Sequence, residues 1–302
     1  MESLRRIPRL RSIAAAACTL LFLSATGHAQ SLESTLQQFN AVTVKGYIQP
    51  MADMFGANMN AGMFHSADIS KSGFHLSFEI VGMGAMVGDN QKSYTVSSPA
   101  GFNPPTFKTA TIFGGKGGVV TDAGTGFTYR GSDGFINTTL FPLAAPQLTI
   151  GDLFGTRAII RFLPAPAFGD QYPKSSLWGI GVQHSISQYL SFIPFPVAAH
   201  VFYNKYSAGD LVNCSGTSIG LDASKKFSVL SVYGGIAWEK SSMRLKYTPA
   251  STQVLPVDIT MDGANSFRAT VGLGLHFGFF SIFGDANFGS ITNISAGIGF
   301  GG

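Results

Sequence analysis

The chain has 302 residues, of which only 12% are charged and 12% are aromatic, and it contains 37 glycines and 26 phenylalanines. So little charge is atypical of a soluble cytosolic enzyme, and so many aromatic residues exclude a disordered chain. The formal net charge is +4, but the first 29 residues hold four of the 20 basic residues and one of the 16 acidic residues. Residues 30–302 are therefore close to neutral, and we expect no nucleic-acid partner.

Residues 1–29 predict a cleaved secretory signal peptide. A basic start, Arg5 to Arg11, precedes the apolar stretch Ile13 to Leu23, and small residues end the segment at Ala29. The apolar stretch is shorter than the roughly 20 residues of a membrane-spanning helix. Lipid attachment at Cys18 is disfavoured because too much of the apolar stretch follows that residue. After cleavage Cys214 is the only cysteine, so no disulfide is expected within the chain.

Apolar and polar residues alternate through most of residues 59–302, which predicts β-strands. In the clearest case, residues 266–277, alternate positions from Phe267 to Phe277 are apolar and the positions between them are polar or glycine. A soluble β-sandwich would also alternate. Several predicted strands, however, have the about 10 residues that cross a bilayer at a tilt, and their polar faces are rich in Ser, Thr, Gly and Asn. Aromatic residues near strand ends suit interfacial girdles: Trp178, Tyr189, Tyr203, Tyr206, Trp238, Tyr247 and Phe277.

We therefore predict an all-β protein, an antiparallel transmembrane β-barrel of about 12 strands, within a range of 10 to 14, with a short N-terminal helical segment. Residues 88–146 interrupt the pattern with Pro and Gly, leaving short strand candidates near Lys108 to Phe113 and Phe127 to Tyr129. This stretch is predicted as a long extracellular loop or a constriction folded into the lumen.

Residues 30–58 differ from the rest because their apolar residues have helical spacing. Leu32, Leu36 and Phe39 predict a short amphipathic segment, and a second helix follows, with Pro50 early in it and Gly56 after it. The apolar face of that second helix consists of Tyr47, Ile48, Met51 and Phe55. Two interpretations remain open: a plug or lid inside a barrel formed by residues 59–302, or a lead-in that packs on the barrel mouth.

The run from Gly46 to Gly62, GYIQPMADMFGANMNAG, with the strand from Gly73 and the Gly-rich last strands, resembles an uncharacterised family of bacterial outer-membrane β-barrels. That family is loosely similar to the long-chain fatty-acid transporters of the outer membrane. The resemblance implies a barrel with an N-terminal element and brings no known substrate and no catalytic residues.

The last strand also resembles the C-terminal strand of bacterial outer-membrane barrels. That strand ends in an aromatic residue and is recognised by the insertion machinery. Ile294, Ile298 and Phe300 share one face of this chain's last strand, although Gly301 and Gly302 follow the Phe. We therefore expect the outer membrane as location, and its lipid and the barrel-insertion machinery as partners.

Charged side chains predicted opposite the apolar strand faces form the main candidate site, because charges facing lipid are costly. They are His75, Glu79, Arg157, Arg161, Asp222, Glu239, Arg244, Arg268, His276 and Asp285. These groups either pair with one another and fill a small lumen, or contact a solute.

Enzymatic chemistry is not supported by the motifs. Gly114 to Gly118 (GGKGG) lacks the order of a phosphate-binding loop. His65–Ser66 and His184–Ser185 are neighbours on predicted strands, so each pair points to opposite faces. No metal ligands at a recognised spacing and no cofactor motif are found, so we expect a non-enzyme without catalytic residues, metal or cofactor.

The leading functional hypothesis is a passive channel or transporter for a small solute, hydrophobic solutes included. The alternative is a non-conducting structural barrel whose loops bind partners.

Overall fold

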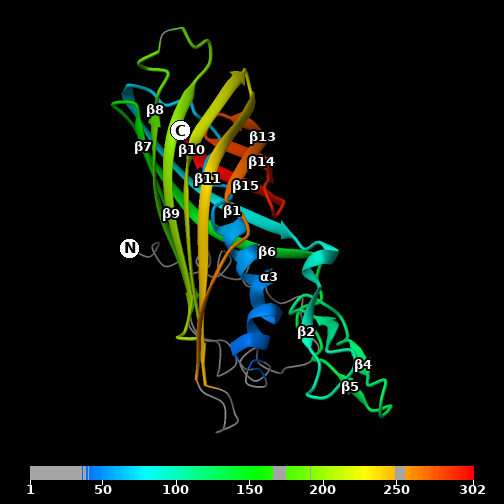
Figure 1. Ribbon diagram of the computed structural model, residues 1–302. Coiled ribbons are helices and arrows are strands. Elements are labelled where there is room, and N and C mark those ends of the chain that lie inside the picture. The colour runs from blue at the N-terminus through cyan, green and yellow to red at the C-terminus, as the bar shows by residue number, and fades with distance from the viewer. Residues whose placement is uncertain (1–35, 37–38, 40, 166–174, 191, 249–255) are drawn as a thin grey trace, which may run out of the picture. The chain divides into compact units, whose positions relative to one another are not determined.

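Figure 1 shows a computed structural model that describes residues 36, 39, 41–165, 175–190, 192–248 and 256–302. The predicted signal peptide, residues 1–29, lies outside the described residues.

Ten antiparallel strands pair in a closed ring, in the order β10-β9-β8-β7-β6-β1-β15-β14-β13-β11, and β11 pairs back to β10 (Figure 1). The strands are β1 Ser72–Met86, β6 Leu140–Leu153, β7 Thr156–Ala165, β8 Ser175–Ser185, β9 Val197–Ala208, β10 Val212–Phe227, β11 Leu230–Tyr247, β13 Phe267–Phe277, β14 Phe280–Phe288 and β15 Asn293–Gly301. An additional strand, β12 Val257–Asp262, pairs with the end of β11 that β13 does not reach. The predicted closed antiparallel barrel of about 12 strands is confirmed.

The two ends of the barrel differ in their connections. At the end called here the turn end, β6–β7, β10–β11 and β13–β14 are joined by tight turns, and both the start of β1 and the end of β15 lie there. Gly278 in the β13–β14 turn has φ +63°, which glycine adopts without strain. At the opposite end, called the loop end, residues 87–139 join β1 to β6.

Residues 87–139 form two small hairpins rather than one irregular loop. After the short helix η1 Asp89–Gln91, β2 Ser93–Ser97 pairs with β3 Thr106–Ala110, and β4 Val119–Thr121 pairs with β5 Thr128–Arg130. In Figure 1 these hairpins lie beyond the end of β1 and the start of β6, away from β13–β15. Strands were predicted close to two of these positions, but the hairpin pairing was not.

On β8 to β11 the outer face of the ring is apolar only in its turn-end half. On β8, β9 and β10 the exposed residues there are Ile180, Val182, Val201, Ile219 and Leu221. Towards the loop end this band stops at three exposed aromatic side chains, Trp178, Tyr203 and Trp238. Beyond them the outward residues are polar or charged: Ser176, Lys205, Ser207, Asn213, Ser215, Lys240, Arg244 and Lys246. An apolar belt edged by aromatic residues is the surface of a transmembrane barrel.

Two of the predicted girdle residues do not belong to this belt. Tyr189 and Phe277 are exposed near the turn end, as a second girdle requires, whereas Tyr206 and Tyr247 face inward and pack in the interior.

Helix α3, Ala41–Met59, occupies the interior of the ring. It contacts β1, β6, β10 and β11 from different sides of the barrel, as well as β12 and β2. From Pro50 to Met59 every residue of the helix is buried, so this part is enclosed on all sides, whereas Val42 near its start is 85% exposed. The helix is one continuous element with Pro50 inside it. It begins before the second segment that the sequence predicts, and it continues past Gly56, where the prediction ended it, to Met59.

Among the described residues, α3 included, no helix combines the length and apolar character needed to cross a membrane.

Candidate functional site: an occupied lumen

The interior of the barrel is filled by residues 41–71, called here the luminal segment, which comprise α3 and the stretch that leads from it to β1. The stretch after the helix runs towards the turn end. There Ala67 N donates to Ser224 Oγ at 2.9 Å, and Phe154 N donates to Lys71 O at 3.0 Å. β1 begins at Ser72.

The wall around α3 is apolar on its inner face. Leu177, Val212, Cys214, Met243, Leu245 and Met261 are buried there against the helix residues Tyr47, Ile48, Met51, Met54 and Phe55. Gly56 permits a close approach to β11, because a Cβ at that position would lie only 2.8 Å from Ser241 Cβ. The plug residues predicted from the sequence, Tyr47, Ile48, Met51 and Phe55, are therefore all buried inside the barrel.

In the turn-end half the inner face of the wall is polar instead, and its side chains bind the backbone of the luminal segment. Arg161 is fully buried and donates to the carbonyl oxygens of Met59, Ala61 and Gly62 at 3.0–3.3 Å. These carbonyls lie at the C-terminal end of α3, where a cation is favourable to the helix dipole. Arg161 therefore holds the point at which the helix ends.

Arg161 belongs to a longer network of buried side chains. Its Nη2 donates to Gln147 Oε1 at 2.9 Å, and Gln147 Nε2 donates to Glu79 Oε2 at 2.9 Å. Glu79 Oε1 lies 2.8 Å from Nε2 of His65, a residue of the luminal segment, and accepts from Ser77 Oγ at 3.0 Å. A buried carboxylate is stabilised by such partners.

A second network holds the helix from the opposite wall. Arg268 Nε donates to Glu239 Oε1 at 2.7 Å, and Arg268 Nη2 donates to Ala57 O of α3 at 2.7 Å. Glu239 also accepts from Asn265. Nearer the turn end, Arg157 donates to Asp152 and to Asp68 O.

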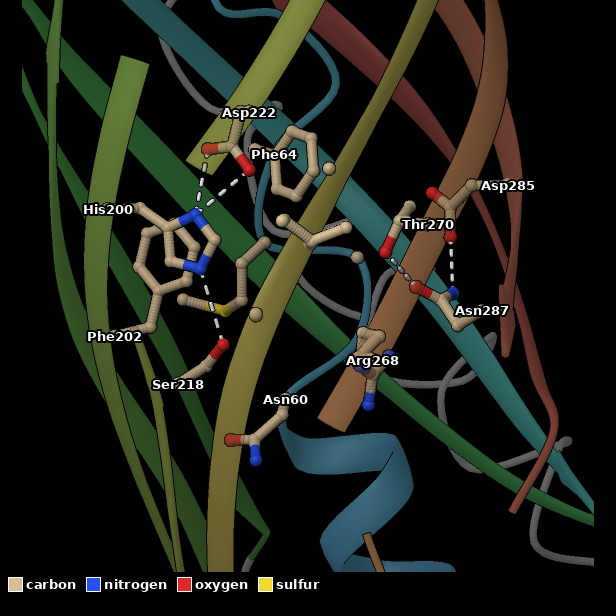
Figure 2. A pocket seen from close by; sticks show the side chains of 15 residues that line it. Asn60, Phe64, His200, Phe202, Ser218, Asp222, Arg268, Thr270, Asp285 and Asn287 are labelled. Atoms are coloured by element: carbon tan, nitrogen blue, oxygen red, sulfur yellow. Dashed lines mark hydrogen bonds and ion pairs between the residues drawn. The ribbon is translucent and has the colours of Figure 1, made fainter. Parts of the chain in front are cut away.

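Figure 2 shows a third group, in which His200 lies between Asp222 and Ser218. His200 Nδ1 lies 2.8–2.9 Å from both Asp222 carboxylate oxygens, and Nε2 lies 3.3 Å from Ser218 Oγ. Phe64 of the luminal segment and Phe202 stack on the His200 ring. Asp, His and Ser follow the order of a hydrolase triad, but the neighbouring cavity measures only about 10 Å³, the space of about one water.

The structure places most of the predicted lumen charges inside the barrel. Glu79, Arg157, Arg161, Asp222, Glu239, Arg268 and Asp285 are buried. His75 and His276 are partly buried and contact Ser77 and Ser231 respectively. They do not form one cluster; the networks lie on different walls and meet through the luminal segment.

Arg244 lies outside the barrel, contrary to the prediction. Its side chain is exposed and donates to both carboxylate oxygens of Asp258 at 2.6–2.7 Å. On β11 the outward residues change from apolar before Trp238 to charged after it, while the inward ones become apolar at Met243 and Leu245. The strand leaves the apolar belt there, so its polar residues face outward and its apolar residues face inward.

Several polar residues of the site were not predicted: His200, Gln147, Gln183, Asn58 and His65. Their partners lie on other strands or on the luminal segment, so sequence spacing does not join them. An inward direction of His200 could have been predicted, because His200 is two residues from both Ala198 and Phe202 on β9 and therefore shares their face.

Several titratable groups outside the spanning strands have altered pKa values, among them Asp53 and Tyr94. Burial raises the pKa of Asp53 on α3, partly opposed by a hydrogen bond from Gln49. Burial also raises the pKa of Tyr94, on β2, to about 12. Within the described part of the chain, no group of three His, Cys, Asp or Glu side chains is placed to hold a metal ion.

The last predicted site residues lie on β15. Ile294, Ile298 and Phe300 face outward from this strand and are exposed on the apolar belt.

A closed antiparallel ring with an apolar outer belt and a filled polar interior defines the fold class of the outer-membrane β-barrels. Within that class, the chain belongs to the family of unknown function DUF6588, whose model matches residues 9–302. The predicted membership of an uncharacterised barrel family is confirmed. No curated protein sequence matches the chain.

Solved structures similar to this chain are themselves distant from it. The attachment invasion locus protein Ail of Yersinia pestis is 9% identical over 75% of this chain and 97% of its own, with a TM-score of 0.27. The toluene transporter TbuX of Ralstonia pickettii is 10% identical over 91% and 95%, with a TM-score of 0.26. The N-terminal β-barrel domain of Pseudomonas aeruginosa OprF is 18% identical over 49% and 98%, with a TM-score of 0.24.

Proposed function

We propose that this protein is a plugged outer-membrane barrel that passes a small apolar solute when the luminal segment moves. Passage is passive and involves no chemical reaction. The signal peptide predicted at residues 1–29 supports export, and the tight turns and both strand termini at one end support a periplasmic turn end.

The observation that carries the proposal is how the lumen is filled. In a small structural barrel the side chains of the wall fill the interior by themselves. Here one continuous segment, residues 41–71, fills it, and Arg161 and Arg268 bind its backbone carbonyls. If that segment moved, it would leave a passage whose wall is apolar at the loop end and polar at the turn end.

The apolar inner wall at the loop end supports an apolar solute. Movement of α3 would uncover Leu177, Val212, Met243, Leu245 and Met261 as one surface. Methionine side chains adapt their shape to different apolar partners, as a site for small hydrophobic molecules requires.

The competing function is a non-conducting structural barrel, and the closed packing of the lumen favours it. The cavity beside His200 holds about one water, and every predicted plug residue is buried. In this alternative the hairpins of residues 87–139 would bind partners, with Phe127 and Tyr129 exposed on or beside β5.

Full-length protein and a variant lacking residues 30–58 distinguish the two functions in planar bilayers. A heat-shift gel first establishes that both are folded barrels. The proposal predicts steady conductance from the truncated barrel and only brief openings from the full-length protein. Silence from both forms would favour the structural barrel, and equal steady conductance would show that the luminal segment is no plug.

The solute class is tested separately with liposomes that contain the full-length protein. We expect faster entry of the apolar dye N-phenylnaphthylamine than in protein-free liposomes, and unchanged entry of a sugar. Faster sugar entry with no effect on the dye would contradict the apolar class while leaving passage itself in place.

We also propose that β15 is the strand read by the insertion machinery, since Ile294, Ile298 and Phe300 form its outward face. Replacement of Phe300 by Ser is expected to reduce the folded fraction in the outer membrane, measured by heat-shift gel. The control is Phe279→Ser, at an exposed residue in the turn between β13 and β14.

A further inference from the structure

A groove of about 420 Å³ lies on the outer surface of β8, β9 and β10. It lies within the apolar belt and is separate from the lumen. Its lining consists of Val182, His184, Ala199, His200, Val201, Ile219, Gly220 and Leu221.

The strand register explains why the wall is hollow at this point. Val182, Val201 and Ile219 are paired across the three strands and form one outward row. In the next row, Ala199 stands between His184 and Leu221, so a methyl group takes the place of a large side chain. The outer surface therefore sinks along Ala199.

The turn-end margin of the groove is polar and fixed. His184 Nδ1 lies 2.8 Å from Thr156 Oγ1, and its Nε2 lies 3.0 Å from both Tyr189 Oη and Gln188 Nε2. The ring is therefore held in place where the apolar belt ends.

A positive charge lies beyond this margin, towards the turn end. Lys225 is exposed on the outward face of β10, four residues nearer the turn end than Leu221, which is about 13 Å along a strand. Its ammonium group lies 5.9 Å from the ring centre of Phe227. An apolar groove with hydrogen-bonding groups at its margin and a cation beyond them has the polarity of a lipid with an anionic headgroup.

We propose that this groove binds one anionic glycerophospholipid from the turn-end leaflet. An acyl chain lies along Ala199 between Val182 and Leu221, and the phosphate lies near Lys225. The bilayer itself covers this surface, because the groove is part of the apolar belt. Trp178 and Tyr203 form the edge of that belt on the loop side. The inference requires only that the barrel spans a membrane, and it holds whether or not the lumen conducts.

The test is native mass spectrometry of delipidated, detergent-solubilised full-length protein titrated with phosphatidylglycerol or phosphatidylcholine. We expect one phosphatidylglycerol to be retained per barrel, in preference to phosphatidylcholine. Ala199→Phe fills the groove and is expected to lower retention of both lipids severalfold. The matched control is Ala269→Phe, at an outward alanine of β13 paired with Ile236 and Phe288.

The headgroup is tested by charge. Lys225→Gln is expected to weaken phosphatidylglycerol binding about fivefold, with little effect on phosphatidylcholine. Lys205→Gln, at an outward lysine on the loop side of the belt, should leave the binding of both lipids unchanged. Equal retention by the parent protein and Ala199→Phe would overturn the proposal. A dimer in the parent that Ala199→Phe dissociates, without a change in lipid retention, would overturn it in favour of a second copy of this chain.

Discussion

At the scale of single residues, buried cations hold the luminal segment in place. Arg161 contacts three carbonyl oxygens at the end of α3 and one side chain of the wall. Removal of a buried partner leaves these acceptors without a donor, and this costs far more than the loss of an exposed pair.

We expect Arg161→Met to lower the free energy of unfolding by about 3 kcal/mol, because buried acceptors are left unpaired. Urea titration of the barrel in detergent, followed by tryptophan fluorescence, measures this change. Arg244→Met is the control, since Arg244 is exposed and pairs only with Asp258 at the surface. A loss at Arg244 equal to that at Arg161 would contradict the proposed anchoring of α3.

Asp53 predicts a pH dependence of stability. Burial raises its pKa in the folded state, so its contribution favours folding below the pKa of the unfolded chain. That contribution is lost as the pH rises through the raised value of the folded state. Asp53→Asn should therefore stabilise the protein at about pH 8 and change it little at about pH 4, in urea titrations at both pH values. A stabilisation that is the same at both pH values would show that ionisation of Asp53 is not its cause.

The side-chain directions show which parts of the candidate site could be predicted from the sequence alone. Strand alternation correctly predicts an inward direction for Glu79, Asp222 and Arg268. It cannot show that Arg161 would bind the end of a helix, because that contact joins residues about 100 positions apart. Arg244 was misplaced because alternation does not reveal where the surroundings of a strand change from lipid to water.

At the scale of elements, α3 fits the barrel because Gly56 allows it to approach β11. A larger side chain at Gly56 would collide with Ser241, whose Cβ would lie only 2.8 Å from the new Cβ. We expect Gly56→Leu to displace the helix and raise the conductance of the full-length barrel in planar bilayers. Gly115→Leu is the control, because a Cβ at Gly115 would have no atom within 4 Å. A folded Gly56→Leu barrel as silent as the parent would contradict this role of the helix.

Elements with strong alternation could be predicted, and those held by distant contacts could not. β13, β14 and β15 follow the sequence pattern closely, because one face meets lipid and the other meets the lumen. β2–β5 are three to five residues long, too short to show a period, and β2 rests against α3. The start of α3 was missed because Val42, Thr43, Val44 and Gly46 are all poor helix formers.

At the scale of the whole molecule, the apolar belt fixes the depth of the barrel in the bilayer. Trp178 and Trp238, the two tryptophans of the chain, both lie at its loop-side edge. We expect lipids brominated near the headgroup to quench tryptophan fluorescence more strongly than lipids brominated near the chain ends. Ile180→Trp in a background with both native tryptophans replaced by Phe should shift the strongest quenching towards the bilayer centre. No quenching by either lipid would contradict the position of the belt.

The central claim is that passage through the barrel requires α3 to move, and a reversible cross-link tests it most directly. Gly56→Cys and Ser241→Cys, in a Cys214→Ser background, place two thiols within reach of a disulfide after a shift of about 1 Å. We predict that liposomes with the oxidised protein take up N-phenylnaphthylamine only as fast as protein-free liposomes, and that reduction restores the faster entry seen with the Cys214→Ser protein. Equal entry before and after reduction, with the disulfide confirmed by mass spectrometry, would contradict the claim.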